Sequence, residues 1–440
     1  MYLFALYLLA LNAFAQTYFS VPGADAPELA AFGPRAVGVR TIELVNPGQV
    51  DILKYNADSK SAPMADRRLK VEVWYPATLA TGEQAHTVYE SPMAGRAAPR
   101  PGMPSTFQVL GKAKRDAAPQ KGEKFPLVIV SHGYPGSRIF LSYLTENLAS
   151  KGYVVAAIDH TDSVFGDIRA FPSTLLHRSA DQLFVLETLS RPTGDFPIDA
   201  TKAAIIGYSM GGYGALASAG AGYNPKSAVA TMVPGGYLES WTAGHEKFMA
   251  RKPANLKAII AIAPWGAAPP MNSWDNKGLE GISLPSLFIV GDQDDISGYE
   301  KGVKRAFDGA RNSERCMLVY ENARHNVGGN PAPEGVALDF TAREVFEEPV
   351  WRKDRILAIN QHFATAFLDL YLKGDETRRA YLHPGTKRAA DATWTAKPGE
   401  PGGKFSTGDG GYWKGFQRRW ALGLQMQCYD AGQPAVSPPR

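Results

Sequence analysis

The sequence is poor in cysteine and carries little net charge. Its 440 residues include two cysteines and eight histidines, and they show none of the Cys and His spacings that bind metal ions. Lysine and arginine number 47 against 43 aspartates and glutamates, and the net charge of +4 comes without a dense basic run. Such a chain is not expected to bind nucleic acid, and we predict no metal site.

The two cysteines, Cys316 and Cys428, leave two alternatives open. In an exported chain an even pair is compatible with one disulfide, which would tie the C-terminal tail to the body of the protein. Two unrelated buried thiols fit the sequence equally well.

Long apolar runs are also scarce. The run over residues 2–15 is too short to span a bilayer, so no membrane span is expected there. It ends in Ala13-Phe14-Ala15, which is similar to a signal-peptidase site and predicts a secretory signal cleaved before Gln16. We therefore predict a periplasmic or secreted protein. No lysine or arginine lies between Met1 and this apolar run, which is a departure from the usual signal peptide. A buried strand is the alternative interpretation of the run.

The remaining chain alternates between strand and helix patterns. Apolar and polar residues alternate over residues 37–45 and 69–75, as in the antiparallel start of a mixed sheet. Short continuous apolar runs then indicate strands buried on both faces, at residues 126–131, 153–158, 203–207, 258–263, 284–290 and 316–320. Helical segments lie between most of them, at residues 137–150, 175–190, 210–221 and 299–310. We predict an α/β fold with a mostly parallel central sheet and helices on both faces.

The domain organisation follows from these elements. We expect one catalytic domain over residues 16–375, with a long irregular surface connection at 77–124. An insertion at about 223–255 is expected to cover the site as a lid, or else to pack elsewhere. An amphipathic helix at 355–372 is expected to close the sheet. Residues 376–440 form a C-terminal extension that packs on the body, with a membrane or polymer surface as the alternative contact. The helix predicted in this extension carries Trp413, Phe416, Trp420 and Leu424 on one face.

A serine lies at the centre of the sequence Gly207-Tyr208-Ser209-Met210-Gly211-Gly212. An apolar run precedes it and small, helix-compatible residues follow, so the order predicts a strand, a sharp turn and a helix with the serine exposed at the turn. The glycines two positions before and after it are needed because larger residues would collide with neighbouring backbone. We predict that Ser209 is a nucleophile, and an ordinary glycine-rich turn is the alternative.

A serine hydroxyl needs a base to remove its proton, and the base needs an acid behind it. In this chain order the acid follows a strand after the serine, and the histidine follows the next strand. His325 lies in the loop after the last predicted parallel strand, so we predict that it is the base. Among three aspartates after the preceding strand, Asp294 best fits the acid, with Asp295 as the alternative. A calcium loop is disfavoured because further ligands are missing.

The oxyanion formed during attack on a carbonyl needs two backbone N–H donors. One is expected from Met210, directly after the nucleophile and at the start of its helix. The other is expected from Tyr134, in a glycine-containing turn after an earlier strand. His132 in that turn would support the site rather than act as a base. His132, His160 and Trp265 are candidates for the substrate pocket, and an ordinary buried tryptophan is the alternative for Trp265.

With these residues identified, the chain resembles α/β-hydrolases of the platelet-activating-factor acetylhydrolase and predicted dienelactone hydrolase group. The resemblance is most specific between about Leu69 and His325. It implies an α/β-hydrolase fold and a Ser–Asp–His site that acts on esters, with a tyrosine or leucine amide in the oxyanion hole. The segments that carry it are Val71-Glu72-Val73-Trp74-Tyr75-Pro76, Ser131-His132-Gly133, Val155-Ala156-Ala157-Ile158-Asp159-His160 and Pro197-Ile198-Asp199.

One departure from the acetylhydrolases concerns the acid. In that family the acid ends the strand directly after the serine's helix, but this chain has Ala263-Pro264-Trp265 there. The acid must come one strand later, from Asp294, which looks more like dienelactone hydrolases and the bacterial cutinase-like polyesterases. Ser209 argues against dienelactone hydrolase activity in the strict sense, because that activity usually has a cysteine nucleophile.

We therefore predict an exported serine carboxylesterase that needs no cofactor and acts on small-molecule or polymeric esters. An amidase or peptidase with the same residues and a polyester hydrolase are the alternatives within enzymes. A non-catalytic binding protein on the same scaffold is a more remote one. The acyl and alcohol specificity and the oligomeric state are not specified by the sequence.

Overall fold

A mixed sheet of 11 strands forms the centre of the computed structural model, which describes residues 22–92, 106–192, 194–333, 339–394 and 402–434. The strand order is β15-β14-β13-β12-β11-β7-β8-β2-β1-β5, and β6 pairs with β2 outside this path. The strands are β1 (Ala36–Val50), β2 (Met64–Thr78), β5 (Ala113–Arg115), β6 (Ala118–Pro119), β7 (Phe125–Ser131), β8 (Val154–Asp159), β11 (Ile198–Tyr208), β12 (Leu256–Ile262), β13 (Ser286–Gly291), β14 (Arg315–Tyr320) and β15 (Leu424–Tyr429).

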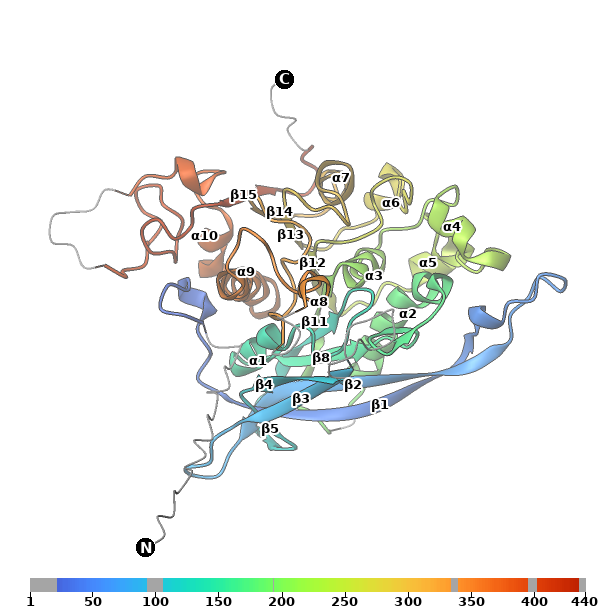
Figure 1. Ribbon diagram of the computed structural model, residues 1–440, viewed down its shortest axis with the longest axis horizontal. Coiled ribbons are helices and arrows are strands. Elements are labelled where there is room, and N and C mark those ends of the chain that lie inside the picture. The colour runs from blue at the N-terminus through green and yellow to red at the C-terminus, as the bar shows by residue number, and fades with distance from the viewer. Residues whose placement is uncertain (1–21, 93–105, 193, 334–338, 395–401, 435–440) are drawn as a thin grey trace, which may run out of the picture.

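The continuous apolar runs form the parallel part of this sheet, as predicted. Strands β8, β7, β11, β12, β13 and β14 pair in parallel, whereas β1 with β2, β2 with β8 and β14 with β15 are antiparallel. The carboxyl ends of the parallel strands therefore meet at one edge, where ligand sites of such sheets form. Figure 1 shows β1 and β2 as a long ribbon that extends beyond the rest of the sheet.

Helices cover both faces of the sheet. Helices α1 and α9 pack on one face and α2, α3 and α7 on the other (Figure 1). Alternate residues of a central strand such as β7 enter the two cores, with Val128 on the α9 side and Ile129 on the α3 side. The helices are α1 (Ser142–Ser150), α2 (Phe171–Ser190), α3 (Met210–Ser218), α4 (Ala228–Met232), α5 (Glu246–Ala250), α6 (Asn276–Leu279), α7 (Arg305–Gly309), α8 (Phe340–Arg343), α9 (Lys353–Lys373) and α10 (Arg379–Leu382).

The C-terminal extension joins the main sheet through β15. Cys316 on β14 lies directly opposite Cys428 on β15, and the two form a disulfide across the strand pair. The predicted helix through Trp413 and Phe416 is wrong, since this stretch consists of turns. Gly415 adopts a φ of 81°, which interrupts the helical pattern. Both aromatic side chains are nevertheless buried against α9.

The segment 77–124 is more regular than its composition suggests. It contains a two-stranded sheet of β3 (Thr87–Pro92) and β4 (Thr106–Gly111), besides the short strands β5 and β6. Side chains at alternate positions, such as Tyr89, Phe107 and Val109, are buried against α1 and the main core. The prediction of an irregular surface connection is therefore wrong for this pair of strands.

The segment proposed as a secretory signal lies outside the described residues, so the structure adds nothing to that prediction. Within the residues that are described, no helix combines the length and the apolar character needed to cross a membrane.

Candidate active site

Ser209 occupies a strained turn between β11 and α3. Its φ of 52° is unusual for a residue with a side chain, and the strain holds the hydroxyl above the end of the sheet. A Cβ added at Gly207 would lie 2.1 Å from the carbonyl oxygen of Gly211, and one at Gly211 would lie 2.0 Å from that of Ser131. The two glycines are therefore required by close backbone contact, as predicted from the motif.

The loops after β13 and β14 bring an aspartate and a histidine to the serine. The Ser209 hydroxyl lies 3.0 Å from His325 Nε2, and His325 Nδ1 lies 3.0 Å from both carboxylate oxygens of Asp294. The two loops can touch because Gly291, at the end of β13, has no side chain. A Cβ added there would lie 2.2 Å from the carbonyl oxygen of Ala323. All three side chains are buried, with the serine and histidine each 8% exposed.

The three aspartates after β13 have different partners. Asp294 Oδ1 accepts hydrogen bonds from the backbone N–H groups of Ile296 and Ser297, which orient its carboxylate toward His325. Asp292 instead accepts the N–H of Asn322, and Asp295 forms an ion pair with Arg324. Geometry therefore favours Asp294 over Asp295 as the partner of the histidine.

A fourth carboxylate, Glu348, holds the histidine loop from the other side. Its two oxygens accept the N–H groups of Arg324 and Asn326, at 2.6 and 2.5 Å, so it brackets His325. Glu348 is 6% exposed, and burial raises the pKa of its carboxyl. Lys353 Nζ donates to the carbonyl of Asn326, and burial lowers the pKa of this lysine to about 8. Neither residue was predicted from the sequence.

A cavity of about 590 Å³ opens beside Ser209 and His325. Phe140 and Tyr208 lie on one side of it, and Tyr208 stacks on Phe140 and packs against the His325 ring. Residues of α8 and the turn that follows, including Phe340 and Val345, line another part of the wall together with Glu348. This part of the wall comes from residues 340–349, for which the sequence predicted no function.

The insertion at 223–255 does not line this cavity, contrary to expectation. Tyr223 stacks on Tyr213 of α3, and the hydroxyl of Tyr237 accepts the N–H of Ala62 near the tip of the β1–β2 ribbon. Its apolar residues belong to the core on the α2 and α3 face. The segment is thus held by packing partners away from the cavity, which is why it does not act as a lid over it.

Two backbone amides remain candidates for binding an oxyanion. Met210 is the first residue of α3, where amides have no partner within the helix. Tyr134 lines the cavity together with Gly133 and Ser209. The residue that follows the nucleophile and the turn after β7 therefore reach the same end of the sheet.

The three residues predicted for the substrate pocket lie elsewhere. His132 and His160 are each 1% exposed and, like Trp265, are not among the residues that line the cavity. The ring of Trp265 packs between Phe171 and Tyr213, and its backbone N–H donates to the carbonyl of Ser209. The pocket prediction is therefore wrong for these side chains, because neighbouring aromatic rings and buried polar groups already surround them.

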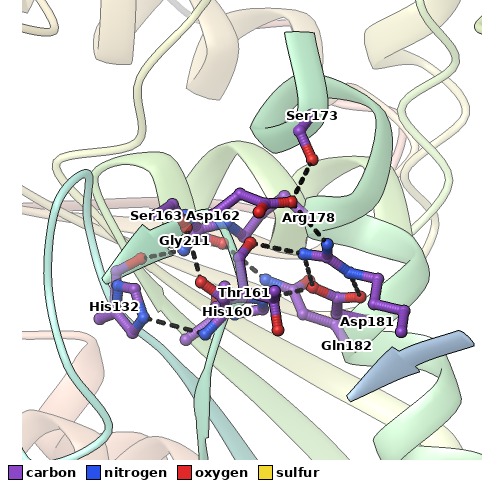
Figure 2. Close-up of polar contacts among 12 residues, drawn as sticks. His132, His160, Thr161, Asp162, Ser163, Ser173, Arg178, Asp181, Gln182 and Gly211 are labelled. Carbon is purple, nitrogen blue, oxygen red and sulfur yellow. Dashed lines mark hydrogen bonds and ion pairs between the residues drawn. The ribbon is translucent and has the colours of Figure 1, made fainter. Parts of the chain in front are cut away.

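His160 belongs instead to a buried polar network (Figure 2). Its Nε2 lies 2.8 Å from the Ser131 hydroxyl and its Nδ1 lies 2.9 Å from Asp181, which also accepts two hydrogen bonds from Arg67. Burial, followed by the charge of Arg178, lowers the pKa of His160 to about 3. This histidine is therefore neutral at ordinary pH.

Potential metal ligands gather at one place in the described residues, where Cys316, His383 and Cys428 lie together. The two sulfur atoms are bonded to each other, so neither is available as a thiolate ligand. This cluster lies on β14, β15 and the loop after α10, and it does not contribute to the cavity.

Comparison with known proteins finds several ester hydrolases that are similar to this chain. Residues 104–169 match the family model for platelet-activating factor acetylhydrolase, isoform II. Cutinase est1 of Thermobifida alba is 26% identical over 209 residues, which cover 47% of this chain and 55% of the cutinase. Platelet-activating factor acetylhydrolase of Gallus gallus is 44% identical over 50 residues, which cover 11% of this chain and 12% of that protein.

Among solved structures, a ferulic acid esterase from Streptomyces cinnamoneus superposes with a TM-score of 0.53 at 22% identity. The match covers 79% of this chain and 94% of that one. By contrast, the chain spans little more than half the length of the cutinases from Thermobifida alba and Thermobifida fusca. With the strand order and the turn at Ser209, the structural likeness shows an α/β-hydrolase fold, and over part of its length the chain is similar to platelet-activating-factor acetylhydrolases and cutinases.

Proposed function

We propose that the protein is a serine hydrolase that cleaves carboxylic esters through an acyl-enzyme. The observation that carries the proposal is the series of contacts from Asp294 through His325 to Ser209, which ends at an open cavity. The names of its relatives, cutinases and esterases, support the same class of substrate.

In the first half of the reaction, Ser209 Oγ attacks the ester carbonyl carbon. His325 Nε2, at 3.0 Å, accepts the hydroxyl proton as the new C–O bond forms. The imidazole becomes positively charged, and Asp294 stabilises this charge while accepting the Nδ1–H hydrogen bond. The carbonyl oxygen becomes an oxyanion, and the N–H groups of Tyr134 and Met210 are the donors that we assign to it.

The tetrahedral intermediate then collapses. His325 returns the proton to the departing alcohol, which leaves as the C–O bond to it breaks, and the acyl group remains on Ser209. In the second half, His325 takes a proton from water, which attacks the acyl carbonyl and releases the acid. The serine recovers its proton, and every proton is accounted for by water and the imidazole.

Apolar side chains around the cavity favour apolar or polymeric esters as substrates. Ile296, Phe340 and Val345 line the cavity and are 59%, 74% and 39% exposed. Such exposed apolar groups beside a site are typical of contact with an apolar ligand or surface. We also infer export, because disulfides such as Cys316–Cys428 form in oxidising compartments.

The experiment is a screen of p-nitrophenyl esters of rising acyl length, together with the matched anilides and a polyester film. We expect ester hydrolysis and covalent labelling by a fluorophosphonate probe, both lost in Ser209→Ala. Hydrolysis of the anilides at rates comparable to the esters would favour an amidase. A wild-type protein that is neither labelled nor active on any ester would contradict the proposal.

A further inference from the structure

The helix α2 carries a buried arginine directly behind the turn that holds Tyr134. Arg178 is 1% exposed, and its Nη1 donates to the carbonyl of His132 at 2.6 Å and to that of Gly133 at 3.5 Å. Its Nη2 donates to the Ser163 hydroxyl at 2.6 Å. These acceptors are carbonyl and hydroxyl oxygens rather than carboxylates. The guanidinium therefore binds the backbone of the turn instead of forming an ion pair through these hydrogen bonds.

His132 holds the same peptide group from within the turn. Its Nε2 accepts the backbone N–H of His160 at 3.3 Å, which places the ring proton on Nδ1. The Nδ1–H then donates to the carbonyl of Gly133 at 2.7 Å. Burial and the charge of Arg178 lower the pKa of His132 well below its usual value, so the ring is neutral and keeps this tautomer.

The carbonyl of Gly133 and the N–H of Tyr134 belong to one peptide plane. In a trans peptide the two groups point in opposite directions. Because the carbonyl is held toward Arg178 and His132, the N–H of Tyr134 is turned away from the network, on the side where Tyr134 and Gly133 line the cavity. The peptide before Met210 is held in the same way, since the carbonyl of Ser209 accepts the N–H of Trp265 at 3.1 Å.

The contacts of α2 extend to α3, which begins directly after Ser209 (Figure 2). Gln182, one turn after Arg178, donates to the carbonyl of Gly211 at 2.9 Å and accepts the Ser218 hydroxyl. A Cβ added at Gly214 would lie 2.5 Å from Gln182 and 2.7 Å from Arg178, so α2 and α3 are in direct contact at this point. One face of α2 therefore contacts both segments that carry the proposed donors.

We propose that Arg178, together with His132, is a positioning residue of the oxyanion hole: it holds the carbonyl side of the 132–134 turn so that the Tyr134 N–H faces the cavity. This inference rests on the proposed ester hydrolysis. Burial lowers the pKa of Arg178 to about 9, so the group still carries its charge at neutral pH. A fixed positive charge behind the donors also favours the negative charge that develops in the reaction.

The test compares Arg178→Met, Arg178→Lys and His132→Gln with the matched control Ser173→Ala. Ser173 lies on the same helix and in the same network, where its hydroxyl donates to Asp162 rather than to the turn. Rates are normalised to active sites titrated with a fluorophosphonate. Affinity for phenylboronic acid is measured in parallel, because its tetrahedral adduct with the serine mimics the oxyanion.

We expect kcat to fall about a hundredfold in Arg178→Met and about tenfold in Arg178→Lys and His132→Gln, with KM within about threefold of wild type. Boronate affinity should weaken by the same factors, while Ser173→Ala changes neither quantity. If kcat and boronate affinity of the variants equal those of Ser173→Ala, the inference is overturned while ester hydrolysis stands. If the arginine variants do not fold, the kcat and boronate affinity of His132→Gln alone test the inference. An inactive wild type would overturn both proposals.

Discussion

The described part of the chain contains two Ser–His–Asp series, and one of them faces the cavity. In the first, Ser209, His325 and Asp294 are joined by contacts of 3.0 Å beside the cavity. In the second, the Ser131 hydroxyl lies 2.8 Å from His160, which lies 2.9 Å from Asp181. The hydrogen-bond distances in the second series are therefore slightly shorter than those in the first.

The surroundings separate the two series. Ser131 lies within β7 and is fully buried, whereas Ser209 lies at a strained turn at the cavity. The carboxylate of Asp181 is shared with the guanidinium of Arg67, and burial with Arg178 lowers the pKa of His160. A base must become positively charged during the reaction. Access to the cavity and the unfavourable charging of His160, rather than hydrogen-bond length, therefore distinguish the series that we propose as reactive from the buried one.

The largest expected effect comes from exchanging the two serines for alanine. Ser209→Ala should lower kcat by about 10⁵-fold, because the nucleophile is lost. Ser131→Ala should keep activity within about tenfold and lower the free energy of unfolding by about 1–2 kcal/mol, because it leaves His160 Nε2 unpaired. Ester hydrolysis and urea denaturation measure the two effects. Labelling of Ser131 by a fluorophosphonate would remove the distinction.

The acids offer the second comparison. Asp294→Asn should lower kcat by about 10⁴-fold without a large loss of stability, because the amide favours the wrong histidine tautomer. Asp181→Asn should instead lower the free energy of unfolding by about 3–5 kcal/mol, because buried Arg67 loses a charged partner. Equal losses of kcat per titrated site in the two variants would contradict this division.

A smaller effect is expected at Glu348, which holds the loop of His325, the proposed base. Glu348→Gln should lower kcat about tenfold, because one of the two amides beside His325 then faces an NH₂ group instead of an acceptor. Glu300→Gln is the control, since this exposed side chain lies outside the cavity and forms a long ion pair with Lys304 at 3.7 Å. Steady-state kinetics should show no more than a twofold change in the control. Similar kcat values in both variants would show that the bracket around His325 is dispensable.

The smallest effect that we expect is a dependence of the free energy of unfolding on pH, caused by buried histidines such as His177. Burial lowers the pKa of His177 from 6.5 to about 4, so between these values the unfolded chain binds more protons than the folded one. The free energy of unfolding should therefore decrease as the pH falls from about 6.5 toward 4. His177→Gln should flatten this dependence in urea titrations at pH 7 and 5. An unchanged slope would show that other groups carry it.

Much of the fold and of the reactive series could be predicted from local pattern. Continuous apolar runs identify buried parallel strands, and such strands end at the same edge of the sheet. Ser209 could be placed by its glycines, and His325 could be placed by its position after the last parallel strand. These features depend on residues close in sequence, which is why the expectations agree with the geometry.

The cavity wall and the network could not be predicted in the same way. Residues 339–349 form one short helix and turns, and their position depends on Phe346 packing against Phe107 and Phe140 from distant segments. Polar residues on α2, such as Arg178 and Asp181, resemble an exposed helix face in the sequence. Their partners come from loops that only the tertiary structure brings together. Tertiary packing likewise decided the place of residues 223–255.

The last strand of the sheet has a consequence for synthesis of the chain. β15 is the outer neighbour of β14, and the loop that carries His325 begins directly after β14. A ribosome reaches Leu424 only after more than 400 residues have been made, so the backbone groups along that side of β14 stay unpaired until then. A premature stop codon or proteolytic trimming before this point would leave an adhesive sheet edge next to the base. Pairing along this side of β14, next to the histidine loop, thus forms late in synthesis.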